Sequence, residues 1–223
     1  MTAMPGTLYI VSTPVGNLAD MTLRGIETLK SVDLIAAEDT RHTRILLDHY
    51  RITTGMTSYF EYNKVRKTEY LLKVLQEGKS VALVSDAGTP GISDPGYRVI
   101  RMCIDNNIPV VPVPGASALL AALVVSGKPT DKFTFEGFLS NKPIKRKNQL
   151  KKLKDEERTA VLYESPHRIL KLLPDILEVY GDIEIVVARE LTKKFEELRR
   201  EKVTETIEHF KSVSPRGEFI VII

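Results

Sequence analysis

Residues 85–96 combine the residue types expected of a ligand-binding loop. They read SDAGTPGISDPG and follow directly on the apolar run VALV at residues 81–84. An apolar run bounded by turn residues is typical of a buried parallel strand, and glycine lets the backbone approach a ligand closely or adopt a positive φ. The segment predicts a site for a small polar molecule at the carboxyl end of a strand. A tight surface turn is the alternative that composition alone leaves open.

Patterns for several other chemistries do not occur in the sequence. The four histidines show no His-x-x-x-His or Cys/His spacing, and neither a Walker A loop nor a Gly-x-Ser-x-Gly elbow is found. We therefore expect no metal site and no nucleophilic hydrolase. The single cysteine, Cys103, excludes an internal disulfide framework, favours a reducing cytoplasm and is expected to be a small buried apolar residue.

The loop at residues 85–96 has to be positioned by the elements around it, which alternate between short strands and amphipathic helices. In the N-terminal half the pattern predicts strands at residues 7–12, 33–37, 81–84 and 109–113, and helices at residues 22–32, 38–50, 64–76, 97–105 and 117–125. This order predicts an open, mainly parallel α/β sheet, in which ligands lie outside the carboxyl ends of the strands.

A change to loop composition at residues 127–131 predicts a domain boundary. We place an N-terminal α/β domain at residues 1–128 and a C-terminal α/β domain at residues 129–223. The second domain is expected to contain strands at residues 133–138, 159–163, 183–188 and 218–223, a short segment at 195–199, and helices at 142–154, 168–179 and 203–210. Short connections between its last strands predict a mixed sheet. Because the chain stops on an apolar strand, we expect either a covered sheet edge or a longer natural protein.

Composition sets broad limits on the class of protein. With 223 residues, 43% hydrophobic and 27% charged, the chain is long enough for a sizeable core and is ordinary for a soluble protein. No stretch reaches the length of a membrane span, and the first six residues lack the regions of a signal peptide, so we expect a cytoplasmic protein without a membrane partner. Residues 1–4 are expected to be disordered. The net charge of +3 permits an acidic partner without requiring one.

Six blocks occur in the order found in the tetrapyrrole methylase superfamily, which the chain resembles over nearly its whole length. The blocks are STPVGNLAD at residues 12–20, AAEDTRHT at 36–43, the loop at 85–96, PGAS at 114–117, YESPHR at 163–168 and ARELTK at 188–193. Within the superfamily the chain is similar to bacterial enzymes that methylate small-subunit ribosomal RNA. Such enzymes commonly carry further residues after the last strand, and the lack of these here bears on substrate affinity rather than on fold.

The resemblance implies a fold, a cofactor and a reaction. It implies a two-domain α/β fold with a mainly parallel N-terminal sheet and a mixed C-terminal sheet, S-adenosylmethionine in the cleft between the domains, and usually a homodimer. It implies methyl transfer to the ribose 2′-hydroxyl of a cytidine in 16S rRNA near the decoding site, on free RNA or on the small ribosomal subunit. The implied cofactor-binding residues are Pro14, Gly16, Asp86, Gly88, Thr89, Gly91, Ile92, Ser117, Ala118, Tyr163 and Glu164.

The methyl transfer that the resemblance implies requires particular side chains. A sulfonium methyl donor needs alignment and exclusion of water rather than a metal, whereas a ribose hydroxyl must lose its proton or have its developing charge stabilised. We hypothesise that Asp39 orients or deprotonates the hydroxyl and that Arg41 binds the neighbouring phosphate. A simple helix cap is the alternative for Asp39.

A second group of residues follows from the same resemblance. It consists of Glu164, Arg168, Glu190 and Lys193 at the cleft edge of the second domain. Arg168 and Lys193 are expected to bind phosphate. Glu190 is a catalytic candidate, with a structural ion pair to Arg189 or Arg168 as the alternative.

A basic segment places seven cations within residues 142–154, a density that suits an RNA backbone. Lys145, Arg146 and Lys147 are the predicted RNA-binding residues of this segment, and a merely solvated helix face is the alternative. Tyr59, Phe60 and Tyr62 offer base stacking, with at least one of them expected in the core. Two other functions stay open: a methylase of the same fold that acts on a small tetrapyrrole, and a non-catalytic, ribosome-associated module that binds S-adenosylmethionine.

Overall fold

The computed structural model describes residues 4–223, so most of the N-terminal segment expected to be disordered lies outside the described residues. The chain divides into two compact units, with the division between Ser117 and Ala118. Each unit contains one five-stranded sheet.

The first unit is built on a parallel sheet. Its strands are β1 (Leu8–Val11), β2 (Leu34–Ala37), β3 (Met56–Ser58), β4 (Val81–Val84) and β5 (Val110–Val113), in the order β3-β2-β4-β1-β5. Each adjacent pair is parallel. The helices are α1 (Leu23–Ser31), α2 (Thr40–His49), α3 (Lys64–Gln76) and α4 (Tyr97–Asp105), with a short 3₁₀ turn, η1 (Leu18–Asp20).

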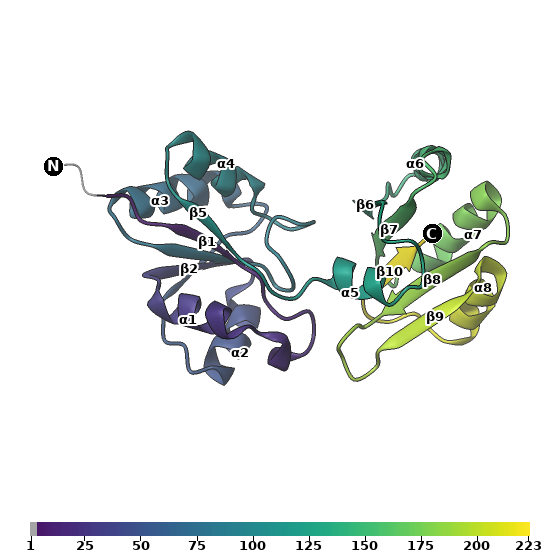
Figure 1. The fold of residues 1–223 in the computed structure, drawn as a ribbon, viewed down its shortest axis with the longest axis horizontal. Helices are drawn as coiled ribbons and strands as arrows, with labels where there is room; N and C mark the ends of the chain where they lie inside the picture. Colours follow the sequence, from purple (N-terminus) through teal and green to yellow (C-terminus); the bar gives the residue numbers. More distant parts are fainter. Residues whose placement is uncertain (1–3) are drawn as a thin grey trace. The chain divides into compact units, whose positions relative to one another are not determined.

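Helices cover both faces of this sheet. Figure 1 shows α1 and α2 on one face and α3 and α4 on the other. The chain moves outward from β1 through β2 to β3 and then returns through β4 to β5, so right-handed crossovers of the two halves place their helices on opposite faces. Successive side chains along a strand point to opposite faces of the sheet and so pack into different cores. Leu83 packs with the side chains of α3 and α4, whereas Val84 packs with those of α1 and α2.

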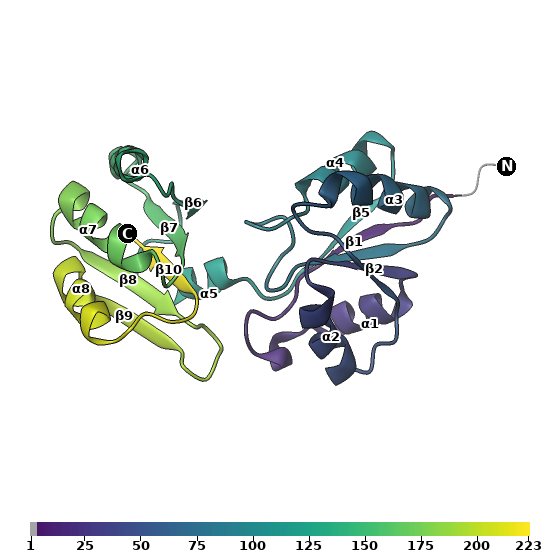
Figure 2. The same cartoon turned by 180° about the vertical axis from the view of Figure 1, so that it is seen from behind.

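The second unit is built on a mixed sheet. Its strands are β6 (Phe133–Phe138), β7 (Thr159–Glu164), β8 (Glu184–Arg189), β9 (Glu197–Lys202) and β10 (Phe219–Ile222), in the order β6-β7-β10-β8-β9. Only the β6–β7 pair is parallel among the four pairings of this sheet within the described residues. The helices are α5 (Ala118–Val124), α6 (Pro143–Asp155), α7 (Ile169–Tyr180) and α8 (Val203–Ser212). Figure 2 shows the same elements from behind.

The two faces of the mixed sheet carry different helices. Leu150 of α6, Leu173 of α7 and Phe210 of α8 share one buried cluster with alternate residues of β7, β8 and β10. Ala122 and Leu123 of α5 pack on the other face. Apolar area buried on both faces explains why β10 reads as a continuous run, FIVI.

The structure bears out most of the predicted elements and differs at three places. Strand β3 was not predicted, because its three residues are only half-buried and show no alternation. The terminal strand β10 is not at an edge but at the centre of its sheet, between β7 and β8. The division between the units precedes α5, whereas the predicted boundary follows it after Lys128; α5 belongs with the second unit because its buried side chains pack on the second sheet.

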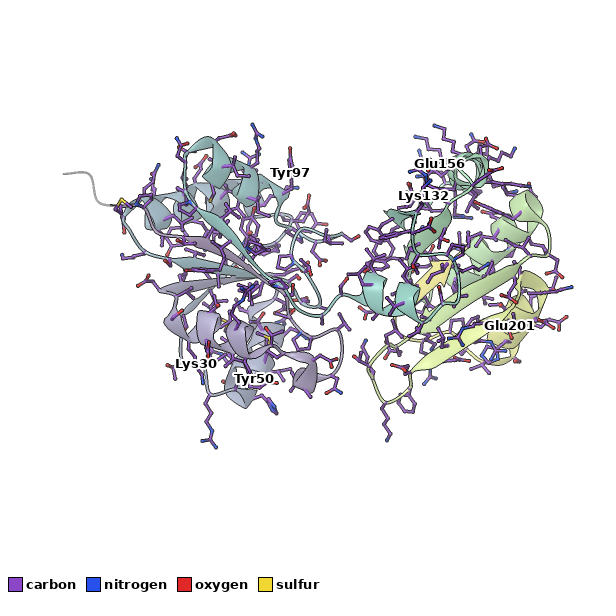
Figure 3. All side chains as sticks on the ribbon, viewed as in Figure 1. Lys30, Tyr50, Tyr97, Lys132, Glu156 and Glu201 are labelled. Atoms are coloured by element: carbon purple, nitrogen blue, oxygen red, sulfur yellow. The ribbon has the colours of Figure 1, made fainter. Side chains whose placement is uncertain are left out.

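Two single-residue features help to hold the first unit. Cys103 is a free, buried thiol in the α3–α4 core, and burial raises its pKa to about 11. Tyr50, which follows α2 (Figure 3), donates its phenolic hydroxyl to the carbonyl of Leu18 and so connects η1 to the end of α2. Within residues 4–223, no helix is both long enough and apolar enough to cross a membrane.

Candidate functional site

The sequence blocks of the first unit lie at one edge of its sheet. Because the five strands are parallel, their carboxyl ends share this edge. Ser12 follows β1, Glu38 follows β2, Ser85 follows β4 and Pro114 follows β5. The fold thus brings together four segments that are far apart in the sequence, at the place where open α/β sheets bind ligands.

The loops after β1 and β4 are hydrogen-bonded to one another. The Thr13 N–H donates to the Gly88 carbonyl at 2.8 Å, and the Gly88 N–H donates to the Thr13 carbonyl at 3.0 Å. The hydroxyls of Ser12 and Thr89 share a hydrogen bond of 2.8 Å, and the Thr13 hydroxyl donates to the Ser85 carbonyl at 3.1 Å. Gly88 has a φ of +72°, a backbone conformation that would be strained in a residue with a side chain. These bonds fix the shape of the predicted cofactor loop.

The loop after β5 closes against the same place. A Cβ added to Gly115 would lie 3.0 Å from Cβ of Ser12, so the two backbones approach closely. A Cβ added to Gly88 would lie 3.6 Å from Cγ1 of Val15 and 3.8 Å from the carbonyl oxygen of Ala116. Three of the predicted blocks therefore form one packed rim of small residues and backbone amides.

An acidic group joins this rim to the loop after β2. The Asp39 N–H donates to Oδ1 of Asp86 at 3.0 Å, and the Asp86 N–H lies 3.5 Å from Oε2 of Glu38. Burial, reinforced by the charges of Asp86 and Asp39, raises the pKa of Glu38, although the hydrogen bond from the Asp86 N–H opposes the shift. A carboxyl with a raised pKa is a better proton acceptor than an ordinary one, so Glu38 is a functional candidate that the sequence analysis passed over within the block EDTRH.

Asp39 caps α2 and pairs with Arg41. Its Oδ1 accepts the backbone N–H of Arg41 at 2.8 Å and the Nε–H at 3.2 Å, while Oδ2 lies 2.9 Å from Nη2. The hydrogen bonds from the Arg41 side chain and backbone, assisted by the Arg41 charge, lower the pKa of Asp39 to about 2. The helix-cap alternative is therefore present in the structure. It does not exclude the predicted role, because the cap uses Oδ1 and the side chain is still 35% exposed.

The second unit brings its own two blocks together. Strands β7 and β8 both run antiparallel to β10, so their carboxyl ends share an edge, and Phe219 of β10 pairs with both Glu164 and Arg189. Lys193 Nζ donates to Oε1 of Glu190 at 2.8 Å and to Oε2 of Glu218 at 3.0 Å. The blocks YESPHR and ARELTK thus lie on either side of the start of β10.

Glu190 is held firmly in this group. It has a φ of +50°, a conformation that persists only where its surroundings fix it, and its Oε1 also accepts the Glu218 N–H at 3.0 Å. Burial would raise the pKa of Glu190, but the hydrogen bonds from Lys193 and Glu218 outweigh it and leave the pKa below its usual value. A Cβ added to Gly217 would lie 2.2 Å from Cδ of Glu190, so this close contact requires glycine.

Glu164 and Arg168 form an ion pair at the end of β7, in which Glu164 is buried and Arg168 is partly exposed. Glu164 is 2% exposed, its Oε1 accepts the Ser165 N–H at 2.8 Å, and Arg168 Nε lies 3.1 Å from the same oxygen. Burial raises the pKa of Glu164 against the opposing effects of the Ser165 N–H and the charges of Arg168 and Arg146. Arg168 also donates to the Leu139 carbonyl at 2.6 Å.

Arg146 of α6, a predicted RNA-binding residue, lies on the buried face of the helix and not on its solvated face. It is 3% exposed, and its Nε donates to Oδ2 of Asp175 on α7 at 2.7 Å. The guanidinium is thereby committed to a structural ion pair and is not free to bind phosphate. Lys145 is exposed, and Lys147 is half-buried and paired with Glu178.

The remaining predicted residues lie as follows. Pro14 is buried, Gly16 and Ile92 are exposed, Gly91 lies in the loop after β4, Ser117 ends the first unit and Ala118 begins α5. In the second unit Ala118 and Tyr163 pack against the same apolar cluster, and the Leu119 N–H donates to the Tyr163 hydroxyl at 3.1 Å. Tyr59 is a core residue at 1% exposure, as expected of at least one aromatic in its segment. Glu218 was missed because no sequence block marks it.

The fold is found in solved structures of other proteins. The chain is similar to cobalt precorrin-4 methyltransferase, with a TM-score of 0.74 and 17% identity, over 97% of this chain and 93% of that one. It is similar to uroporphyrin-III C-methyltransferase from Thermus thermophilus in complex with S-adenosylhomocysteine, with a TM-score of 0.68 and 18% identity, over 97% of each chain. These likenesses confirm the predicted fold.

Sequence comparison identifies the family. The model of the Tetrapyrrole (Corrin/Porphyrin) Methylases matches residues 7–207, and the chain belongs to this family. It is 53% identical to ribosomal RNA small subunit methyltransferase I of Synechocystis sp., over 98% of this chain and 78% of the relative. The protein of the same name from Thermotoga maritima is 50% identical, over 98% of both chains. The one from Escherichia coli O157:H7 is 48% identical, over 98% of this chain and 77% of the relative.

Proposed function

We propose that this protein is an S-adenosylmethionine-dependent methyltransferase that modifies the ribose 2′-hydroxyl of a cytidine in 16S rRNA near the decoding site. The names of its relatives support rRNA of the small subunit as the substrate class, and the solved neighbour with S-adenosylhomocysteine supports the cofactor. One observation carries the proposal: Oδ1 of Asp86, in the predicted cofactor loop, accepts the backbone N–H of Asp39, in the predicted acceptor loop. This bond supports the proposal, because it holds the loop predicted to bind the cofactor next to the loop predicted to bind the acceptor hydroxyl.

The rim of the first unit fits the cofactor. Its polar groups are a carboxylate, Asp86, the hydroxyl of Thr89 and the backbone around Gly88, which suit the amino, ribose and carboxylate groups of S-adenosylmethionine. When bound, this cofactor supplies an electrophilic methyl group. We assign its binding to the predicted residues of this unit: Pro14, Gly16, Asp86, Gly88, Thr89, Gly91, Ile92 and Ser117.

The acidic group supplies what the acceptor hydroxyl needs. Asp39 orients the hydroxyl through its exposed carboxylate, and Arg41, whose side chain is 90% exposed, binds the adjoining phosphate. Glu38 takes the proton, because its raised pKa makes it a better base than Asp39. In the second unit, Glu190 positions Lys193, and Lys193 and Arg168 bind RNA phosphate together with Lys145 and Lys147. We further propose that the protein works in the cytoplasm as a homodimer.

The test of this function is transfer of labelled methyl from S-adenosylmethionine. We expect label on small ribosomal subunits that lack the modification, at one cytidine ribose and resistant to base hydrolysis. Naked 16S rRNA and a tetrapyrrole precursor are assayed in parallel. Label on the tetrapyrrole alone would identify a small-molecule methylase, and cofactor binding without transfer to any RNA would identify a non-catalytic module; either result contradicts the proposal.

The basic face of α6 gives a second prediction. Lys145, Lys151 and Lys152 are exposed, and replacing all three with glutamine should flatten the dependence of log affinity on log salt by about 0.7 to 0.9 for each phosphate that the variant no longer neutralises. RNA affinity is measured between low and physiological salt. The matched control replaces Lys30, Lys73 and Lys79. These exposed lysines belong to the first unit and lie at the end of its sheet where the parallel strands begin. An unchanged slope in the α6 variant would make this face a passive surface.

A further inference from the structure

A hollow in the first unit lies beside the acidic group and outside the proposed cofactor rim. Its volume is about 530 Å³, and it is lined by Thr40, Arg41, Arg44, Met56, Thr57 and Ser58. These residues come from the first turns of α2 and from β3. Asp39, the proposed hydroxyl-orienting residue, immediately precedes this lining. A molecule in the hollow would therefore be a neighbour of the reacting group.

The charges around the hollow favour an anion. Arg41 and Arg44 are both exposed, and the Lys67 ammonium donates to Oγ1 of Thr57 at 2.6 Å. Asp39 already pairs with Arg41, which leaves Arg44 and Lys67 as cations with no carboxylate of the lining opposite them. The start of α2 adds the positive end of a helix dipole. Phosphate is the anionic group that such a set of guanidinium, ammonium and hydroxyl donors recognises.

The loop that follows Ser58 of the lining carries two aromatic rings and is held in place. The ring centroids of Phe60 and Tyr62 are 6.5 Å apart, and Tyr62 is 95% exposed. The Phe60 N–H donates to Oδ1 of Asn63 at 2.9 Å, and Nδ2 of Asn63 lies 3.2 Å from Oγ of Ser58 in the lining. The loop is therefore fixed to the wall of the hollow. Exposed rings beside a cationic groove are the arrangement by which proteins bind single-stranded nucleic acid.

We propose that this hollow and the Phe60–Tyr62 ring pair form a subsite for a nucleotide of single-stranded RNA next to the methylated one. Arg44 and Lys67 bind its phosphate, and Tyr62 stacks on its base. The inference rests on the proposed function and deepens it, because it assigns recognition of the flanking RNA to the loops after β2 and β3. A free phosphate would use the cations but not the ring, so the ring is the part that distinguishes a nucleotide from a free phosphate.

The experiment measures binding of a fluorescein-labelled single-stranded RNA of about ten nucleotides that contains one cytidine. Arg44→Ala and Tyr62→Ala should each weaken RNA binding about 5- to 100-fold. Tyr62→Phe keeps the ring and should bind RNA as the unmodified protein does. The affinity for S-adenosylmethionine should stay unchanged in all three. Arg101→Ala on α4 and Lys30→Ala, whose side chain projects from the end of α1 (Figure 3), serve as controls.

Two outcomes overturn the subsite. The first is RNA affinity within twofold of the unmodified protein in both alanine variants. The second is competition by inorganic phosphate together with full RNA affinity in Tyr62→Ala, which would describe a small-anion site. Methyl transfer to small subunits is assayed separately, so a protein that binds the oligonucleotide through Tyr62 but methylates no RNA would contradict the proposed function while leaving the subsite intact.

Discussion

Replacing Asp39 with asparagine is expected to slow methyl transfer to small ribosomal subunits by about 100-fold or more, with little change in melting temperature. Asparagine caps helices about as well as aspartate, so the bond from the Arg41 N–H to Oδ1 is kept. The negative charge is lost, and with it the ion pair from Oδ2 to Arg41. The hydroxyl then lacks the carboxylate that orients it, although Glu38 is still present as the base, and Arg41 is no longer held by its ion pair.

Asp39→Ala is the matched variant, because it removes the cap as well as the charge. It should lose the same activity and in addition about 1 kcal/mol of stability. Turnover and RNA affinity are measured together with thermal unfolding for both variants. If Asp39→Asn kept full turnover and full affinity for the substrate, Asp39 would be a cap and nothing more.

The pH dependence of the same reaction separates the two carboxyls. The pKa of Asp39 is about 2, below its unfolded value, so its contribution to stability is present above the unfolded pKa and is lost only as the pH falls toward 2. Asp39 therefore stays ionised over any practical assay range. Glu38 has a raised pKa, and an acid limb of the rate profile above the ordinary glutamate range should belong to it. This limb should persist in Asp39→Asn and disappear in Glu38→Gln.

The first unit shows how far the sequence alone can lead. Apolar runs bounded by turn residues located β4 and placed the loop after it at a carboxyl edge, because both are local properties of the chain. The predicted parallel sheet implied that ligands lie outside the carboxyl ends of its strands, but the hydrogen bond between Asp39 and Asp86 at this edge is seen only in the structure. The sequence pattern did not single out Glu38, whose raised pKa depends on burial and on the charge of Asp86, 48 residues later in the chain.

The second unit shows what local patterns miss. Lys193 binds Glu218, whose position is set by the central strand β10 and not by any motif around it. The hollow beside α2 depends in the same way on β3, a strand too short and too polar to be predicted. Charge density in residues 142–154 was visible in the sequence, but the face that each cation occupies depends on α7, which supplies the partner of Arg146.

The buried face of α6 gives the second prediction with a large effect, a loss of stability. Arg146→Met should lower the free energy of unfolding by about 3 to 5 kcal/mol, because it leaves the Asp175 carboxylate buried without its main partner. Nη2 of Arg146 lies 2.6 Å from Oδ2 of Asp175, and the two side chains are 4% and 11% exposed. Lys147 Nζ, at 3.7 Å from Oδ1, is too distant to replace the missing hydrogen bonds.

The double variant Arg146→Met/Asp175→Leu is the informative control for this pair. Replacing both charges with apolar side chains of similar size removes the stranded carboxylate, so much of the lost stability should return. Urea unfolding followed by far-ultraviolet circular dichroism measures the midpoints.

The triple variant of Lys145, Lys151 and Lys152 should have an unfolding midpoint near that of the unmodified protein and yet bind RNA with a flatter salt dependence. If Arg146→Met instead kept the original midpoint and flattened that dependence, Arg146 would belong to the RNA surface after all, and the inward-facing pair would not describe the protein in solution.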